Sequence, residues 1–200
     1  MKSLTIVVSI TVALSLVSLS CPLKAQASNA ASASSNPLAG LDLGESGQLT
    51  GFPARFNHHL VSLEDGHFKS FDASTLKNVK FWAFYYSASW CPPCRAFTPK
   101  LVDFYKQFKS QHPNFELIFV NHDESGDAML EYMKTDAMPW PAVRFDDIES
   151  VKANKYCGAG IPDLVLVDAD GKVLSDSFNG QEYVGPEKVM DDIKSLVPTP

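Results

Sequence analysis

Apolar residues along the chain form runs typical of buried strands and stripes typical of amphipathic helices. The aromatic run Lys80–Tyr86 predicts a central strand buried on both faces of a sheet. From Pro92 onward, apolar residues recur at helical spacing and predict a helix. Phe115–Val120 predicts a second strand, and Gly126–Lys134 predicts a second helix. The stripe of the first helix consists of Phe97, Leu101, Phe104, Tyr105 and Phe108, and that of the second of Met129, Tyr132 and Met133.

The C-terminal part of the chain has a different pattern. After a weaker helical signal at Asp147–Tyr156, Leu164–Val167 predicts a short strand. A turn at Asp168–Gly171 then returns the chain to an antiparallel partner at Lys172–Ser175. Pro186 begins a last helix, whose inward residues are expected to be Val189, Met190, Ile193 and Leu196. Together the elements predict an α/β domain with a mixed central sheet flanked by α-helices.

The first fifty residues are interpreted as an export signal and a linker. Lys2, an apolar stretch from Leu4 to Leu19 and the small-residue run Ala25-Gln26-Ala27 are typical of a cleaved signal peptide. We therefore expect a signal over residues 1–27, a flexible linker over 28–50 and the folded domain over 51–200. This division predicts secretion across the inner membrane into the periplasm, with no membrane span left after cleavage.

Composition limits the class of partner. The 200 residues suffice for one domain, and 45% of them are hydrophobic. The formal net charge is −6, and no run of Lys or Arg is present. A nucleic-acid partner is therefore not expected. We expect a monomer.

The motif with the clearest chemistry is Trp90-Cys91-Pro92-Pro93-Cys94. Cys91 is predicted to lie at a helix N-terminus, where free backbone N–H groups and the helix dipole favour a thiolate. Cys94, one turn further on, can then close a disulfide with it. Pro92 suits the first helical turn, and Pro93 stiffens the spacer.

Two other uses of the cysteine pair fit the sequence less well. A zinc site needs further Cys or His ligands at matched spacing, and neither Cys157 nor the histidines supply that pattern. A purely structural disulfide across two residues would stabilise little. We therefore expect no metal and no cofactor other than the redox-active disulfide Cys91–Cys94. Cys157 itself is expected to be a buried small hydrophobe.

The motif and its surroundings resemble a known family. The run Ser87–Arg95, its continuation Phe97–Leu101, and the downstream segments Asn121–Asp123, Met138–Val143 and Gly160–Pro162 resemble the tryparedoxin and nucleoredoxin branch of the thioredoxin superfamily. The resemblance extends roughly from residue 59 to 197. It implies the thioredoxin fold.

The resemblance also implies site residues. Trp90 would shield the site and contact partners, Pro162 would be the cis-proline facing the sulfurs, and Ile161 would offer backbone groups to an extended substrate. Trp140 is interpreted either as part of the groove rim or as a core aromatic. The predicted substrate-binding set is Trp90, Pro92, Pro93, Trp140, Ile161 and Pro162.

Three residues are candidates for tuning the cysteine pKa. Tyr85 stands where many thioredoxins carry a buried Asp, and a tyrosine is a poor base near neutral pH. Arg95 would add positive potential or be a solvated helix residue. Asp163 replaces a common Thr, and a carboxylate near Cys91 would raise the pKa of that thiol.

The sequence therefore predicts a thiol–disulfide oxidoreductase that reduces disulfide-containing proteins and is recharged by a membrane electron donor. Two alternatives are also compatible with the sequence. One is a thiol-dependent peroxidase, and the other is a non-catalytic peptide-binding module of the same fold.

Overall fold

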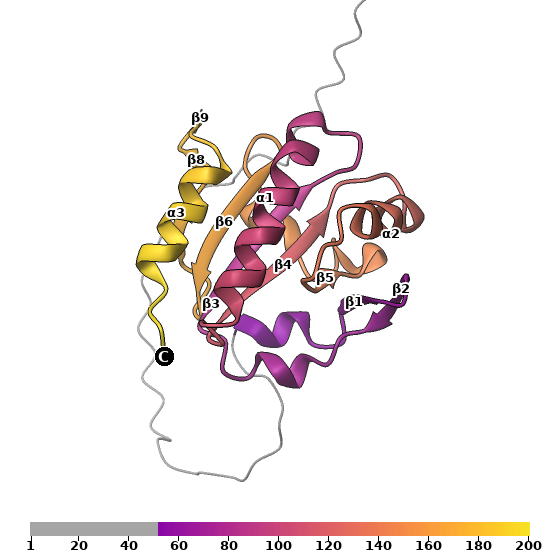
Figure 1. Cartoon of the computed structure of the whole chain (residues 1–200), viewed down its shortest axis with the longest axis horizontal. Helices are drawn as coiled ribbons and strands as arrows, with labels where there is room; N and C mark the ends of the chain where they lie inside the picture. Colours follow the sequence, from indigo (N-terminus) through magenta and orange to yellow (C-terminus); the bar gives the residue numbers. More distant parts are fainter. Residues whose placement is uncertain (1–51) are drawn as a thin grey trace, which may run out of the picture.

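The computed structural model describes residues 52–200, which form a seven-stranded sheet in the order β2-β1-β5-β4-β3-β6-β7 and a separate two-stranded sheet, β8-β9 (Figure 1). The strands are β1 (Leu60–Glu64), β2 (His67–Ser70), β3 (Phe81–Ser87), β4 (Phe115–Asn121), β5 (Ala142–Val143), β6 (Asp163–Asp168), β7 (Val173–Asp176), β8 (Phe178–Asn179) and β9 (Glu182–Tyr183). The α-helices are α1 (Pro92–Lys109), α2 (Gly126–Thr135) and α3 (Pro186–Leu196), and the 3₁₀ helices are η1 (Phe52–Phe56), η2 (Ala73–Leu76), η3 (Phe145–Asp147) and η4 (Ala153–Tyr156).

The large sheet is mixed, as predicted. β3 pairs in parallel with β4 and antiparallel with β6, and β4 pairs in parallel with β5. The β1–β2, β1–β5 and β6–β7 pairs are antiparallel. α1 connects β3 to β4, so the predicted strand–helix–strand unit is confirmed, as is the hairpin β6–β7 that follows it.

β3 is buried on both faces because its residues alternate between two hydrophobic cores. Tyr85 belongs to the core beneath the three α-helices, whereas Phe84 and Tyr86 belong to the core on the opposite face. Residues of η1, η2 and η4 and the loop before η4 cover that second core. The fold is therefore a sheet covered on both sides, with β3 close to its middle.

The helices predicted from Pro92, at Gly126–Lys134 and from Pro186 are confirmed as α1, α2 and α3, with one correction in α3. Phe97, Leu101 and Tyr105 of α1 are buried in the first core. Val189 and Ile193 of α3 are buried there too, as predicted. The exception is Leu196, which is exposed, because the inward position at the end of α3 is taken by the next residue, Val197. The stripe predicted for α2, Met129, Tyr132 and Met133, is buried.

The helix predicted at Asp147–Tyr156 is wrong. Only two short 3₁₀ helices form there, η3 ending at Asp147 and η4 beginning at Ala153. Lys152 between them adopts a left-handed backbone conformation with φ 51° and ψ 45°, which interrupts any continuous helix. Ile148 and Val151 still bury their side chains, so the apolar spacing in this segment reflects packing of a loop against the second core.

The turn at Asp168–Gly171 is confirmed. Oδ1 of Asp168 accepts hydrogen bonds from the backbone N–H groups of Asp170 (3.0 Å) and Lys172 (2.9 Å). Gly171 has φ 77°, a conformation that a residue with a side chain rarely adopts. The chain therefore reverses tightly and β7 pairs with β6.

The predicted signal peptide (1–27) and linker (28–50) lie outside the described residues and stay predictions. Within residues 52–200, none of the helices has the length and apolar character needed to cross a membrane.

Candidate active site

Cys91 and Cys94 lie where β3 passes into α1. Cys91 is the N-cap residue of α1, with an extended backbone (φ −93°, ψ 105°), and its Sγ accepts a hydrogen bond of 3.3 Å from the backbone N–H of Cys94. A disulfide joins the two cysteines, whose Cα atoms are 5.2 Å apart. Pro92 and Pro93 occupy the first helical positions, where a missing N–H costs nothing. The predicted strand–helix junction is therefore confirmed.

The two sulfurs differ in access to solvent. Cys91 is 4% exposed, whereas Cys94 is completely buried. Ala88 and the partly buried Ile161 pack against them, while Pro92 and Pro93 are exposed. A group approaching from solvent therefore reaches Cys91 first, and Cys94 lies behind it.

A cis-proline loop faces this pair. The Ile161–Pro162 peptide bond is cis, and the carbonyl oxygen of Ile161 lies 3.7 Å from Sγ of Cys91. Pro162 is buried and Ile161 partly buried. The structure thus brings together Cys91, Ile161 and Pro162, as the family resemblance implied.

Trp90 is 54% exposed beside the pair. Its indole Nε1 donates a 3.2 Å hydrogen bond to the carbonyl oxygen of His122, and the backbone N–H of His122 donates to the carbonyl oxygen of Ser87 (2.9 Å). The loop after β4 therefore supports the loop that precedes Cys91. This contact was not predicted. A signal for it exists, because the carboxyl ends of the parallel strands β3 and β4 meet at one edge and a polar run follows each strand.

Trp140 does not form the rim of a groove, and the prediction of a substrate-binding role for it is wrong. It is 1% exposed and belongs to the core beneath the α-helices. Its ring meets those of Tyr85 and Tyr105 edge to face, with centroids 6.2 and 5.5 Å apart. The core interpretation of this residue is the one that the structure supports.

Tyr85 belongs to a buried network of hydroxyl groups beneath Cys94. Its hydroxyl lies 2.8 Å from Oγ1 of Thr98 and 3.4 Å from the carbonyl oxygen of Cys94. Thr98 in turn lies 2.8 Å from the hydroxyl of Tyr132, which is 2.8 Å from Oγ of Ser87. Burial raises the pKa of Tyr85 well above its usual value of 10, so the phenol is neutral at physiological pH. It is therefore no general base in that range.

Arg95 and Asp163 differ in burial. Arg95 is exposed on α1, close enough to Asp136 for its charge to oppose the burial that raises the pKa of that carboxyl group. Asp163 is completely buried, and its Oδ2 accepts a 2.7 Å hydrogen bond from the backbone N–H of Gly158. The effect of either charge on the Cys91 thiol stays a prediction. Cys157 is buried in the second core, which confirms its predicted burial but not its predicted role as a small hydrophobe.

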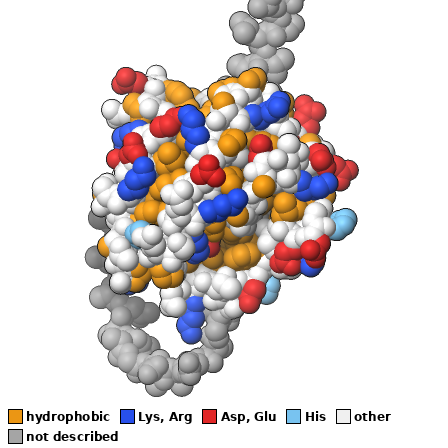
Figure 2. Space-filling model, viewed as in Figure 1, with side chains coloured by type: hydrophobic (Ala, Val, Ile, Leu, Met, Phe, Trp, Pro, Cys, Tyr) orange, Lys and Arg blue, Asp and Glu red, His pale blue; other side chains and the backbone are white. Residues whose placement is uncertain are grey.

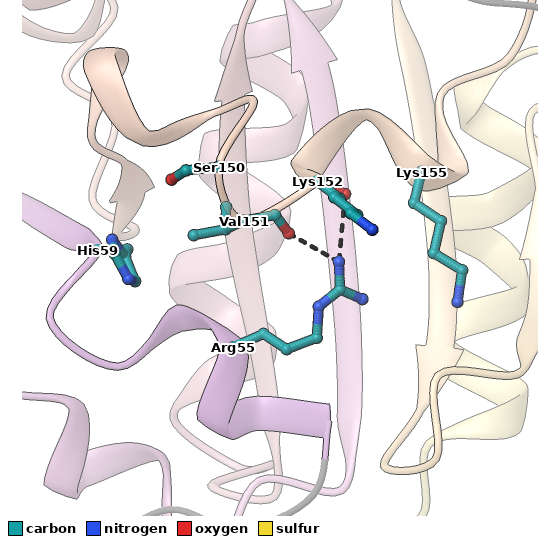
Figure 3. A pocket seen from close by; sticks show the side chains of 6 residues that line it. All are labelled: Arg55, His59, Ser150, Val151, Lys152 and Lys155. Carbon is teal, nitrogen blue, oxygen red and sulfur yellow. Dashed lines mark hydrogen bonds between the residues drawn. The ribbon is translucent and has the colours of Figure 1, made fainter.

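A basic pocket of about 500 Å³ lies elsewhere on the molecule (Figure 3). Nη2 of Arg55 donates hydrogen bonds to the carbonyl oxygens of Val151 (2.7 Å) and Lys152 (3.4 Å). This arginine therefore fastens η1 to the turn before η4, which is a structural role. The pocket is lined by Arg55, His59, Ser150, Val151, Lys152 and Lys155. Across residues 52–200, no three His, Cys, Asp or Glu side chains are grouped so as to hold a metal ion.

A disulfide at the N-terminus of the helix that follows a central strand, facing a cis-proline loop, defines a protein of thioredoxin fold. The model of the thioredoxin-like family matches residues 78–173. The chain is 37% identical to a thioredoxin from Wuchereria bancrofti, with 68% of this chain and 94% of that chain covered and a TM-score of 0.51. It is 35% identical to tryparedoxin II from C. fasciculata, with coverage of 64% and 87% and a TM-score of 0.52.

A curated relative points to the same branch. Over 92 residues the chain is 44% identical to probable nucleoredoxin 1 of Arabidopsis thaliana, which is 46% of this chain and 16% of the relative. The chain belongs to the thioredoxin superfamily, in its tryparedoxin and nucleoredoxin-like branch. It spans only about a fifth of the length of the curated nucleoredoxins that it matches.

The predicted periplasmic localisation is wrong. The matched nucleoredoxins come from plants and animals, among them Arabidopsis thaliana and Homo sapiens, and these organisms have no periplasm. The membrane electron donor was expected on the same grounds and stays a prediction without support from the described residues.

Proposed function

We propose that the chain is a thiol–disulfide oxidoreductase that reduces disulfides in other proteins through Cys91 and Cys94. The observation that carries the proposal is the arrangement of the two sulfurs. Cys91 lies at a helix N-terminus with an N–H group directed at its sulfur, and the fully buried Cys94 lies within bonding distance behind it. Membership of the thioredoxin superfamily supports the same chemistry.

In the reduced protein, Cys91 would react as a thiolate. The backbone N–H of Cys94 and the positive end of the α1 dipole both favour negative charge on this sulfur. The thiolate attacks one sulfur of the substrate disulfide, an S–S bond forms to Cys91, and the other substrate sulfur leaves as a thiolate and takes up a proton.

Cys94 would then complete the reaction. Once it has lost its proton to solvent, its sulfur attacks Cys91, the mixed disulfide breaks, and the second substrate thiolate leaves. The substrate gains two electrons and two protons, and Cys91–Cys94 is left as the disulfide observed here. A dithiol donor returns the pair to its reduced state.

An insulin-reduction assay with dithiothreitol as donor tests this proposal. The wild-type protein should accelerate precipitation of the reduced insulin chains, and Cys91→Ser should abolish the acceleration. Cys94→Ser should also be inactive but should accumulate a mixed disulfide with its substrate, because nothing remains to resolve it. Ser110→Ala, at the far end of α1, is the matched control and should keep full activity.

Two outcomes would contradict the proposal. One is a wild-type protein no faster than dithiothreitol alone, and the other is a Cys91→Ser variant that remains active. If the wild-type protein is no faster than dithiothreitol and both it and Cys91→Ser bind unfolded peptides, the protein is a peptide-binding module. The direction of electron flow has its own test, equilibration with glutathione buffers. A reduction potential as oxidising as about −120 mV would contradict a role as reductant.

A further inference from the structure

The β8–β9 hairpin lies beside the candidate active site. It follows the segment that matches the thioredoxin-like family, which ends at residue 173. Gly180 at its tip has φ 66°, which permits the tight reversal. Figure 1 shows the hairpin at the same end of the molecule as the start of α1. The hairpin is therefore an element that the family model does not describe, close to the sulfurs.

The hairpin is fixed to the cis-proline loop at two points. The hydroxyl of Tyr183 donates a 2.9 Å hydrogen bond to the carbonyl oxygen of Pro162. Phe178 packs so closely over Gly158 that a Cβ atom there would lie 2.3 Å from the phenylalanine ring. The rings of Phe178 and Tyr183 also contact each other, with centroids 5.0 Å apart. Tyr183 is therefore held in place by its hydroxyl and by its neighbour.

Although it is held in this way, Tyr183 remains 48% exposed. It and its neighbour Val184 are two of the four exposed large hydrophobic residues among those described, and Trp90 is a third. Hydrophobic side chains reach the surface along this end of the molecule in Figure 2. An aromatic ring that is already immobilised offers contact area to a partner at little cost in conformational entropy. Burial, with the nearby charge of Glu187, raises the pKa of Tyr183 to about 12, so the ring carries no charge at physiological pH.

Geometry relates Tyr183 to the reactive sulfur. Sγ of Cys91 lies 3.7 Å from the carbonyl oxygen of Ile161, and the hydroxyl of Tyr183 binds the next carbonyl along the chain, that of Pro162. Trp90 immediately precedes Cys91 in the sequence. A polypeptide joined to Cys91 through a mixed disulfide would therefore extend along the cis-proline loop toward Tyr183. A small disulfide would not extend so far.

We propose that Tyr183 determines specificity by contacting an aliphatic or aromatic side chain next to the disulfide of a polypeptide substrate. This inference rests on the function proposed above. It assigns the ring of Tyr183 to substrate binding and its hydroxyl to holding the ring. Disulfides flanked by apolar residues are then preferred substrates. The rate at which small disulfides are reduced does not depend on Tyr183.

Two synthetic peptides test the inference. They are identical, with one internal disulfide each, except that Leu or Ser precedes the first cysteine, and the small disulfide DTNB serves as a third substrate. The wild-type protein should show a KM lower by roughly tenfold for the Leu peptide, with similar kcat, because half of a leucine side chain is buried in the complex. Tyr183→Ala should abolish that preference and leave the rate with DTNB unchanged.

Two variants serve as controls. Tyr183→Phe keeps the ring and should retain most of the preference for the Leu peptide. Leu196→Ala removes the fourth exposed large hydrophobic residue, at the C-terminal end of α3, and should change nothing. A loss of preference in Tyr183→Phe as large as in Tyr183→Ala would overturn the role of the ring.

The remaining outcomes separate this inference from the proposed function. A wild-type protein that reduces none of the three substrates contradicts the proposed function, and the inference fails with it. An active wild-type protein overturns the inference alone in two cases. In one, Tyr183→Ala keeps the preference for the Leu peptide. In the other, it slows all three reactions equally, which would mean that Tyr183 acts only on the structure of the loop.

Discussion

Oδ1 of Asp123 accepts two hydrogen bonds from Ser89, one from the backbone N–H (2.8 Å) and one from the hydroxyl (2.7 Å). Ser89 stands two residues before Cys91, and Asp123 stands two residues after the end of β4. Asp123 is buried, so water competes little for these bonds. The pair connects the loop that carries the candidate nucleophile to the neighbouring strand.

Asp123→Ala should destabilise the protein by about 2 to 3 kcal/mol, because two hydrogen bonds to a carboxylate are lost and the N–H of Ser89 is left without this acceptor. Asp123→Asn keeps an acceptor oxygen and should lower the free energy of unfolding by a smaller amount. Urea unfolding of both variants measures the difference. An Asp123→Ala variant within about 0.5 kcal/mol of the wild type would show that the pair contributes no stability.

Thr98 is the centre of the buried hydroxyl network, so its removal should be costly. Thr98→Val preserves the shape of the side chain but removes one partner of the Tyr85 hydroxyl and one partner of the Tyr132 hydroxyl. We expect a loss of about 2 kcal/mol in the free energy of unfolding. Thr98→Ser retains the hydroxyl and is the control. Equal stability of the two variants by calorimetry would contradict a role for the network.

Gly158 and Gly160 form a matched pair of positions in the cis-proline loop. A Cβ atom on residue 158 would lie 2.3 Å from the ring of Phe178, whereas one on residue 160 would meet nothing within 4 Å. Gly158→Ala should therefore lower stability by about 1 to 3 kcal/mol, and Gly160→Ala should change it by less than about 0.5 kcal/mol. Thermal unfolding of both variants checks this. If Gly158→Ala and Gly160→Ala unfold at the same temperature, Phe178 of the β8–β9 hairpin does not pack on Gly158 as described.

All six tyrosines have a raised pKa, chiefly because of burial, and this predicts loss of stability in alkali. Above pH 10 the unfolded chain releases phenolic protons that the folded protein retains, so the free energy of unfolding falls as pH rises. Each buried tyrosine contributes about 1.4 kcal/mol per pH unit until its own folded pKa is reached. The half-exposed Tyr183 contributes less.

Urea unfolding at pH 8, 10 and 11.5, with tyrosinate absorbance as a second reading, measures this effect. Tyr105→Phe should weaken the dependence on pH, since its hydroxyl donates to Glu116 at 2.6 Å and that carboxylate opposes ionisation. Constant stability up to pH 11.5 would contradict the assigned pKa directions.

The sequence predicted those elements whose apolar pattern is long and regular. β3, β4, β6, α1, α2 and α3 all have the type predicted, and the Cys-x-x-Cys spacing located the candidate site at the right junction. These elements meet the core directly, so their patterns reflect burial.

Elements that depend on distant partners escaped prediction. β5 has only two residues and forms because β1 and β4 flank it. β1 and β2 are short, and β2 is largely exposed, which weakens their hydrophobic pattern. For the β1–β2 hairpin, however, a turn signal in the sequence was missed. Asp65-Gly66 joins the two strands with φ values of 53° and 77°, and this dipeptide is a strong indicator of a hairpin.

Site residues were predictable to the extent that they lie near the cysteines in sequence. Trp90, Pro92 and Pro93 are next to the cysteines in the sequence. Pro162 is distant from them and was predicted from the resemblance to the thioredoxin superfamily. Trp140 was misassigned because flanking prolines are compatible with either a surface turn or a buried one. Asp123 and Tyr183 reach the site only through the packing of separate elements, so their contacts were not predicted. Thr98 lies one turn after Cys94 on the same helix, but its bond to Tyr132 depends on the packing of α2 against α1.

β3 gives alternate side chains to two separate interiors and then leads straight to Cys91. Tyr85 packs on one side and Tyr86 on the other, so loosening either interior displaces the same strand end. We therefore expect the reactivity of Cys91 to depend on the packing of both cores. A substitution that loosens either core should therefore change the reactivity of the Cys91 thiol even where the secondary structure is intact.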